Sequence, residues 1–412
     1  MEMKRYKFIS ANEYCVRVFD GTHDSPKPCE KGYKLLTSKN ILAGELDKTS
    51  AYYISENDYN AINQRSKVQQ YDILFSMIGS VGNVCFVKDS NIDFAIKNMG
   101  VFSCENKEKA LYLYYYLQSP FAKKMIDSYL NGAVQKFLGL ERLRNFPILE
   151  YSTDKQKIAA ILSSLDDKIA LNKKINAKLE AMAKRLYDYW FVQFDYPDKN
   201  GKPYKTSGGK MVWNEVLKRK IPEGWEVKRL GDLFLNKISA TEPGEHLKNL
   251  EYCPIDEIPM RRMSFAGGKS YNEANSSLQL YGMKDILIGA MRVYFHRCCI
   301  AAKAGITRTT TIVLTPHNKT HLSYLYQVCN EDKTFDFAIK VSNGTQQPYV
   351  TWKALSDYYF VYPNDETIID VFCDKTNSVI EMVLKNEKEI QKLTDLRDRM
   401  LPLLMNGQVE VE

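Results

Sequence analysis

The sequence contains no Cys-x-x-Cys pair, although it has nine cysteines among 412 residues. Paired spacings of that kind form zinc sites and redox centres, and a regular even set in a short secreted chain indicates a disulfide framework. An odd, scattered set is typical of reduced thiols in a cytoplasm. We therefore expect a cytoplasmic protein whose cysteines are reduced.

Long apolar runs are also missing. The first residues, Met1–Tyr6, lead into no apolar signal core, and no segment approaches the roughly 18 apolar residues that a membrane-spanning helix requires. The sequence therefore predicts a soluble protein without a membrane partner.

Recognisable catalytic motifs are lacking as well. Gly268–Ser270 resembles the end of a phosphate-binding loop, but Met263 stands where that loop requires glycine. His317 and His321 have the spacing of a zinc-protease pair, but Asn318 replaces the glutamate that the motif needs. No Asp- or Asn-Pro-Pro-Tyr tetrad is present, and no glycine-rich turn that would hold a methyl donor. We expect no catalytic residue, no cofactor and no metal site in this chain.

Length and composition indicate a folded protein of more than one domain. At about 150 residues per domain, a chain of 412 residues corresponds to two or three domains. Hydrophobic residues make up 44% and charged residues 26%, as in folded globular proteins. The formal net charge of +7 permits a nucleic-acid partner but does not by itself indicate one.

The two halves of the chain repeat each other at an offset of about 212 residues. Two apolar segments in each half have the length of paired buried strands, and a helix-length apolar segment follows. After it comes a loop of similar sequence, Asn131–Phe137 in one half and Asn343–Tyr349 in the other. The matched apolar segments are 71–75 with 284–288, 84–87 with 297–300, and 111–117 with 322–328. Four matches in the same order predict a duplicated domain.

A heptad pattern follows each half. Apolar residues recur at alternating spacings of four and three over residues 158–190 and 372–404. Thr153 and Gln156 form a capping-box pattern before the first segment, and Asn406–Gly407 is a helix stop after the second. Sustained heptads predict a coiled coil, and the simplest partner of each helix is the other. The seam residues that we single out are Leu165, Ile169, Asn172, Leu179, Leu186, Val379, Val383, Asn386, Leu393 and Met400.

Two asparagines occupy equivalent positions of this seam, Asn172 and Asn386. A buried amide would fix the register of the two helices at some cost in stability. The alternative is that both asparagines face solvent on slightly irregular helices. The sequence leaves both interpretations open.

The segment between the first helix and the second half, beginning at Phe194–Pro203, is rich in turn-forming residues and predicts a linker. The predicted organisation is a first domain at 1–150, a central long helix at 151–194, a linker at 195–223, a second domain at 224–362, a C-terminal long helix at 363–406 and a tail at 407–412.

Several motifs in both halves point to a known family. They are Asp20–Pro26, Lys157–Ile169, Trp190–Val192, Gly224–Leu233 and Gly344–Pro348, together with the two Asp-Ile-Leu strands. With the layout of two globular halves, each followed by a long helix, they resemble the specificity subunits of type I restriction-modification systems. The resemblance covers nearly the whole chain.

The resemblance implies an α+β fold with two tandem α/β target-recognition domains, each followed by a long helix, the two helices pairing as an antiparallel coiled coil. Each domain would read one half of an asymmetric bipartite site in double-stranded DNA, and helix length would set the gap between the halves. The implied partners are double-stranded DNA, two methyltransferase subunits that dock on the helices and use S-adenosylmethionine, and two motor-nuclease subunits. This chain would itself be non-catalytic.

Direct readout of DNA uses glutamine or asparagine for adenine, arginine or lysine for guanine, and threonine for the thymine methyl group. The candidates are Thr22, His23, Ser76, Gln135 and Lys136 in the first half, and Arg292, Gln346, Gln347, Tyr349, Thr351 and Lys353 in the second. For each, the alternative is a solvated loop residue or a phosphate contact that positions the duplex. The first loop departs from the family pattern at Lys136, where the second loop has Pro348.

Two other functions and one other role of a motif have to be considered. The chain could be a self-contained DNA methyltransferase or nuclease with its own recognition domains, or a coiled-coil scaffold without affinity for nucleic acid. The tyrosines of 112–116 could stack on bases, but aromatic residues at helical spacing usually pack into a core. We predict core packing for them.

Overall fold

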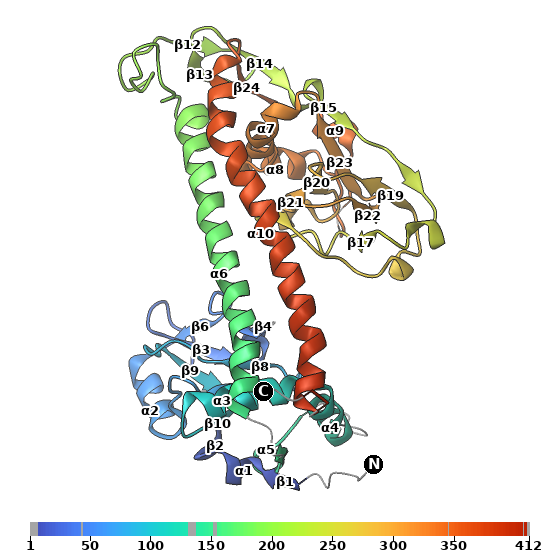
Figure 1. Cartoon of the computed structure of the whole chain (residues 1–412). Helices are drawn as coiled ribbons and strands as arrows, with labels where there is room; N and C mark the ends of the chain where they lie inside the picture. Colours follow the sequence, from blue (N-terminus) through green and yellow to red (C-terminus); the bar gives the residue numbers. More distant parts are fainter. Residues whose placement is uncertain are drawn as a thin grey trace. The chain divides into compact units, whose positions relative to one another are not determined.

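The computed structural model describes residues 7–42, 44–130, 137–150, 155–344, 346–406 and 408–409. The chain divides into two compact units: unit 1 has residues 1–167 and 394–412, and unit 2 has residues 168–393. Two long helices, α6 (Lys155–Tyr187) and α10 (Thr367–Met405), each contribute one segment to each unit (Figure 1). Within the described ranges, no helix is long and apolar enough to cross a membrane.

Both units mix helices with sheets, so the predicted fold class, two α/β domains each followed by a long helix, is confirmed. Besides α6 and α10, the elements of unit 1 are β1 (Lys7–Ser10), α1 (Ala11–Tyr14), β2 (Arg17–Asp20), β3 (Tyr33–Thr37), β4 (Ile41–Leu42), β5 (Glu45–Leu46), β6 (Tyr52–Ile54), α2 (Glu56–Ser66), β7 (Ile73–Ser76), β8 (Val84–Phe86), β9 (Phe94–Lys97), β10 (Met99–Ser103), α3 (Lys107–Gln118), α4 (Pro120–Leu130), α5 (Leu140–Arg144) and β11 (Pro147–Glu150).

In chain order the elements of unit 2 are β12 (Met211–Asn214), β13 (Arg219–Pro222), β14 (Trp225–Arg229), β15 (Phe234–Asn236), β16 (Ala240–Thr241), β17 (Glu251–Cys253), β18 (Ser264–Phe265), β19 (Leu278–Tyr281), β20 (Ile286–Gly289), β21 (Cys298–Ala301), β22 (Gly305–Arg308), β23 (Thr311–Pro316), α7 (Leu322–Cys329), α8 (Asp332–Lys340), α9 (Trp352–Leu355) and β24 (Tyr359–Pro363).

The centre of unit 1 is an antiparallel sheet with the strand order β2-β10-β7-β8. Strand β7 is buried along its whole length, which explains why its sequence is almost continuously apolar. The predicted pair of buried strands is confirmed, because β7 pairs with β8. A second sheet has the order β6-β3-β9, in which β3 and β9 are parallel.

Unit 2 repeats this topology. Its central sheet has the order β15-β23-β20-β21, with β18 added parallel to β21 at the edge. The pairing of β14 with β24 corresponds to that of β1 with β11, and the parallel pair β17–β22 corresponds to β3–β9. The duplication predicted from the sequence is therefore confirmed as a duplication of the fold.

A buried aspartate precedes the central strand in both units. Asp72 accepts hydrogen bonds from the Gln69 amide and the Ser103 hydroxyl, and burial raises the pKa of its carboxyl. Asp285 accepts from the Gly282 amide at 2.6 Å and from the Thr315 hydroxyl at 2.7 Å. Each aspartate thus closes the turn into the central strand and ties it to the neighbouring strand.

The tyrosines of α3 lie in the core of unit 1, as predicted. Tyr112, Tyr115 and Tyr116 are buried, so these rings are not available as a stacking surface for bases. The Tyr115 hydroxyl donates to Asp166 Oδ2 on α6 at 2.7 Å. The same core includes the last residues of α10, Leu404 among them.

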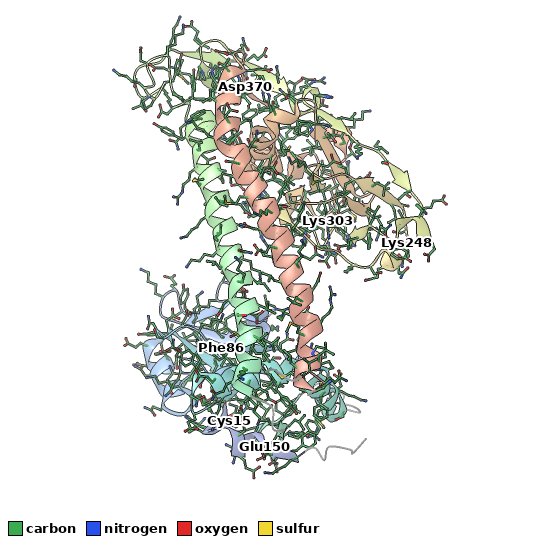
Figure 2. The ribbon with its side chains drawn as sticks, in the orientation of Figure 1. Cys15, Phe86, Glu150, Lys248, Lys303 and Asp370 are labelled. Carbon is green, nitrogen blue, oxygen red and sulfur yellow. The ribbon has the colours of Figure 1, made fainter. Side chains whose placement is uncertain are left out.

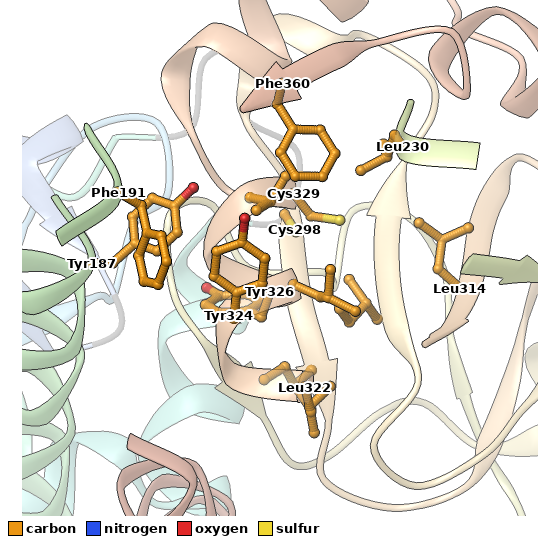
Figure 3. Close-up of a cluster of buried hydrophobic side chains, with 14 of the residues drawn as sticks. Tyr187, Phe191, Leu230, Cys298, Leu314, Leu322, Tyr324, Tyr326, Cys329 and Phe360 are labelled. Atoms are coloured by element: carbon orange, nitrogen blue, oxygen red, sulfur yellow. The ribbon is translucent and has the colours of Figure 1, made fainter. Parts of the chain in front are cut away.

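The core of unit 2 is built around the opposite ends of the two long helices. Tyr187 and Phe191, at the end of α6 and in the π-helical turn after it, meet Tyr324 of α7, and Figure 3 shows these rings lying together. Phe372 of α10 is fully buried and makes an edge contact with Phe191 at 5.2 Å between ring centroids.

The segment 195–223, predicted as a linker, is a folded part of unit 2. It contains the antiparallel hairpin β12–β13. The rings of Tyr196 and Tyr204 stack at 4.8 Å, and Asp195 accepts hydrogen bonds from the amide and hydroxyl of Thr206. The turn-forming residues are present as expected. The aromatic and side-chain contacts nevertheless hold the segment in a defined structure, so it is not a flexible linker.

Replacing Phe372 by alanine tests the role of α10 in the core of unit 2. We expect Phe372→Ala to lower the free energy of unfolding by about 3–5 kcal/mol, because it leaves a cavity among the surrounding rings. Chemical denaturation measures the change. Val371→Ala, at a neighbouring position that is 43% exposed, is the matched control and should stay within about 0.5 kcal/mol. Equal effects of the two substitutions would contradict the packing.

Candidate nucleic-acid interface

In unit 1, two of the predicted DNA-contact residues follow β2. Thr22 is buried, and its hydroxyl accepts from the Asp24 amide at 3.1 Å. His23 is exposed, with Nε2 3.0 Å from Asp20 Oδ2 and Nδ1 2.8 Å from Asn98 Oδ1. The ring of His23 is therefore held in a defined orientation at the surface.

Ser76, at the end of β7, is completely buried. Its hydroxyl donates to the Ser80 carbonyl and accepts from the Asn83 amide at 2.9 Å. These bonds close the turn that follows β7, so the side chain is committed to the turn and is not presented at the surface. Gln135 and Lys136 lie outside the described residues.

A cavity of about 620 Å³ lies beside this turn. Lys39, Tyr52, Asn98 and the turn residues Ile78–Ser80 contribute to its wall. Asn98 also holds His23, so this histidine lies next to the cavity. Sequence reasoning missed Asn98; its only local signal is an asparagine between two strands, where the backbone takes the positive φ of 53° that asparagine tolerates.

In unit 2, the predicted residues come from two adjacent loops. Arg292 follows β20, and its amide donates to the Pro348 carbonyl at 2.7 Å, which links it to the loop 343–349. Asn343 and Tyr349 close that loop with two backbone hydrogen bonds of 2.8 and 2.9 Å. All six predicted residues are exposed: Arg292, Gln346, Gln347, Tyr349, Thr351 and Lys353.

Thr351 and Lys353 belong to the short helix α9 and its cap. The Thr351 hydroxyl accepts from the Ala354 amide at 3.3 Å and thereby caps α9. Lys353 lies within that four-residue helix. The structure therefore brings Arg292, the two glutamines and Tyr349 together, and places Thr351 and Lys353 directly after them in the chain.

The two long helices pack antiparallel within unit 2 through a polar seam. Asn172 is 3% exposed and donates to Glu389 Oε2 at 3.0 Å. Asn176 is 1% exposed; it donates to Glu387 Oε1 and accepts from Asn386 Nδ2, both at 2.8 Å. Of the two predicted seam asparagines, Asn172 is buried and Asn386 is half-buried, and neither faces solvent freely because both amides are bonded across the seam. Because every amide found a partner, the network favours one register of the helices.

The other predicted seam residues are buried or half-buried. Ile169, Val379 and Val383 are buried, and Leu165, Leu179, Leu186, Leu393 and Met400 are half-buried. Within unit 1, Arg397 Nη1 donates to Asp166 Oδ1 at 2.8 Å and joins the two helices there.

Hydrogen bonds and ion pairs of charged side chains connect the globular part of unit 2 to the long helices. Arg262 donates to Glu387, which is 4% exposed and is also bound by Asn176. Lys303, labelled in Figure 2, donates to Gln391 Oε1 of α10 at 2.9 Å and pairs with Glu251. Near the beginning of α10, Asp370 Oδ1 lies 2.9 Å from His321 Nε2. The helices and this domain thus form one connected body.

Glu180 of α6 has a largely buried carboxyl. Burial raises the pKa of its carboxyl to about 7, although the Met263 backbone and the charge of Arg262 lower it. Its Oε1 is buried without a hydrogen-bond partner among the described residues. A charge at this position therefore costs stability.

Nothing in the described parts of the chain gathers three histidine, cysteine, aspartate or glutamate side chains in a way that could hold a metal ion. What the geometry presents instead is a pair of similar domains, each with exposed polar loops after its central strand, attached to paired helices.

Comparison with known proteins shows which family the sequence resembles. The family described as "Type I restriction modification DNA specificity domain" matches residues 28–181. The Type I restriction enzyme MjaIX specificity subunit of Methanocaldococcus jannaschii is 27% identical over 316 residues, which cover 73% of this chain and 69% of that protein. The Type I restriction enzyme HindI specificity subunit of Haemophilus influenzae is 26% identical over 313 residues, covering 62% of this chain and 67% of that protein.

A solved structure shares the fold. The S subunit of a type I restriction-modification system from M. genitalium aligns over 98% of this chain and 97% of its own length, with a TM-score of 0.56 and 14% identity. Residues 28–181 therefore match the specificity-domain family of type I restriction-modification systems, and the chain is similar to specificity subunits of such systems.

The raised pKa of the Glu180 carboxyl predicts a pH dependence of stability. The pKa of Glu180 is raised from 4.5 to about 7 in the folded protein. The stability that depends on the protonated carboxyl is therefore fully present below about pH 4.5 and is lost as the pH rises through 7. We expect Glu180→Gln to remove this loss and to be more stable than the wild type by roughly 2 kcal/mol above pH 7, after allowance for partial exposure.

Chemical denaturation at pH 5 and at pH 8 measures this difference. Asp374→Asn, which removes an exposed carboxylate of α10, is the control for loss of a charge. A constant difference between Glu180→Gln and the wild type at both pH values would refute the assignment.

Proposed function

We propose that this chain is the DNA-recognition subunit of its complex and that each of its two domains reads one half of an asymmetric bipartite site. The observation that carries the proposal is the duplicated fold, which presents a loop at the same end of the central strand in both units. Two readers with different loop sequences suit two different half-sites.

The residues proposed to contact DNA are the exposed predicted residues and the two predicted residues that lie outside the described ranges. In unit 2 they are Arg292, Gln346, Gln347, Tyr349, Thr351 and Lys353; in unit 1 they are His23 together with Gln135 and Lys136 of the loop outside the described residues. Thr22 and Ser76 we assign to the support of the loops, because both are buried and bonded within the protein.

The long helices are proposed to set the gap between the two half-sites and to dock the methyltransferase subunits. They contain 33 and 39 residues, which correspond to roughly 50 and 58 Å at 1.5 Å per residue. Two methyltransferase subunits would supply the adenine methylation and its S-adenosylmethionine, and two motor-nuclease subunits the cleavage. In this proposal the chain contributes binding and positioning and carries out no chemistry itself.

Mapping of methylated adenines tests the proposal. The chain is co-expressed with its methyltransferase subunit in a host that lacks other adenine methylation, and single-molecule sequencing gives the motif. We expect a split motif with a fixed gap, and exchange of residues 1–150 for those of another specificity subunit should change one half only.

The outcomes separate the rival functions. An unbroken motif, or a motif unaffected by the exchange, contradicts the two-reader proposal. Methylation or cleavage of DNA by the purified chain alone supports a self-contained enzyme, and absence of any DNA binding by the assembled complex supports a scaffold.

Arg292 allows a sharper test of direct readout in unit 2. Its exposed guanidinium suits a bidentate contact with guanine, which contributes about 1–3 kcal/mol of discrimination. We expect Arg292→Ala to relax preference at one position of one half-site, measured by equilibrium binding to duplexes substituted at each position. Uniform weakening on all duplexes, with a salt slope reduced by about one, would instead make Arg292 a phosphate contact. Lys248→Ala, labelled in Figure 2 and distant in sequence from both loops, is the control.

A further inference from the structure

The chain returns from the two proposed DNA-contact loops in the same way in both units. In unit 1, Phe137 forms a β-bridge with Ile78, and the Leu138 amide donates to the Met77 carbonyl at 3.0 Å. In unit 2, Tyr349 forms the corresponding bridge with Met291, and the Val350 amide donates to the Ala290 carbonyl at 2.9 Å. Phe137 and Tyr349 are therefore structurally equivalent.

Both aromatic residues combine an anchored backbone with an exposed ring. The neighbours that hold the backbone are buried: Met77, Leu138, Ala290 and Val350. Phe137 is nevertheless 45% exposed and Tyr349 46% exposed. Because the backbone is already held, binding a partner through such a ring costs little further conformational entropy.

A single exposed apolar side chain is common on protein surfaces and needs no explanation. Here the exposure recurs at the equivalent position of two domains whose loops otherwise differ. Each ring also has an apolar neighbour across the bridge, Ile78 at 41% exposure and the half-buried Met291. Each unit thus has an aromatic and an aliphatic side chain side by side at the equivalent bridge, Phe137 with Ile78 and Tyr349 with Met291.

The polar surroundings of the two rings favour DNA as the partner. In unit 2, exposed Arg292, Gln346 and Gln347 flank Tyr349, and in unit 1 Gln135 and Lys136 directly precede Phe137 in the sequence. Amide and cationic side chains pair with base edges and phosphates, and an apolar ring among them suits the thymine methyl group in the major groove.

We propose that Phe137 and Tyr349 are equivalent specificity-determining residues, each packing its ring against the 5-methyl group of a thymine in one half of the target. The proposal rests on the proposed function of the chain as a two-domain DNA reader. It assigns one base preference in each half-site to an apolar contact rather than to a hydrogen bond.

The first test needs no variant. Once the split motif is known, the wild-type complex with its methyltransferase subunit is bound to duplexes in which each thymine in turn is replaced by uracil, which removes only the methyl group. We expect one sensitive position in each half, with binding weakened about fourfold, the factor for exposing one methyl-sized group. A half-site with no recognised A·T pair, or without a uracil-sensitive position, overturns the proposal.

The second test links each methyl group to its ring. Phe137→Ala should abolish the difference between thymine and uracil in one half, and Tyr349→Ala should abolish it in the other. Phe8→Ala and Tyr359→Ala are matched controls, since these rings are 43% and 44% exposed and lie on β1 and β24. Both controls should keep the thymine preference.

The remaining outcomes are distinct. Retention of full uracil sensitivity in Phe137→Ala and Tyr349→Ala overturns the proposal, and loss of assembly with the methyltransferase subunit would make the rings a protein-docking surface. Failure of the proposed function itself appears earlier, as the absence of a split motif in the wild type.

Discussion

The pairing of α6 with α10 is the interaction on which the rest of the structure depends, because both domain cores include segments of both helices. In unit 1, Ile158 and Leu162 of α6 share a core with Leu404 and Met405 of α10. In unit 2, Phe372 of α10 packs among rings from the end of α6. Neither core is complete without a helix segment that lies far away in the sequence.

The polar seam adds a requirement for one register to this apolar packing. Apolar seams alone tolerate shifts of a heptad, whereas Asn172 and Asn176 find their partners in a single alignment. Glu180 shows the cost, since its carboxyl is buried without full hydrogen bonding. The long helices are proposed to set the gap between two half-sites on DNA. A single register would keep that gap constant, at the cost of some stability.

The duplicated framework separates what is shared from what differs. Both units share a four-stranded arrangement of the central sheet, to which β18 is added in unit 2, and both have a buried aspartate before the central strand. The surroundings of that strand differ between the units. Unit 1 has a cavity bordered by Ile78–Ser80. In unit 2, Arg297 donates a hydrogen bond to the Asp256 carbonyl at 2.9 Å. Shared strands hold the loops in place, and different side chains around them suit different targets.

Local patterns in the sequence determined the duplicated strands, the two long helices and the burial of the α3 tyrosines, because periodicity and hydrophobic runs act over neighbouring residues. Tertiary structure alone decided that Ser76 is buried in a turn, that 195–223 is folded, and that His23 is held by Asn98, since each depends on partners from elsewhere in the chain. It also decided the partners of the seam asparagines. The heptad marks such residues as facing a seam, but only the packed helices show which carboxylate each amide meets.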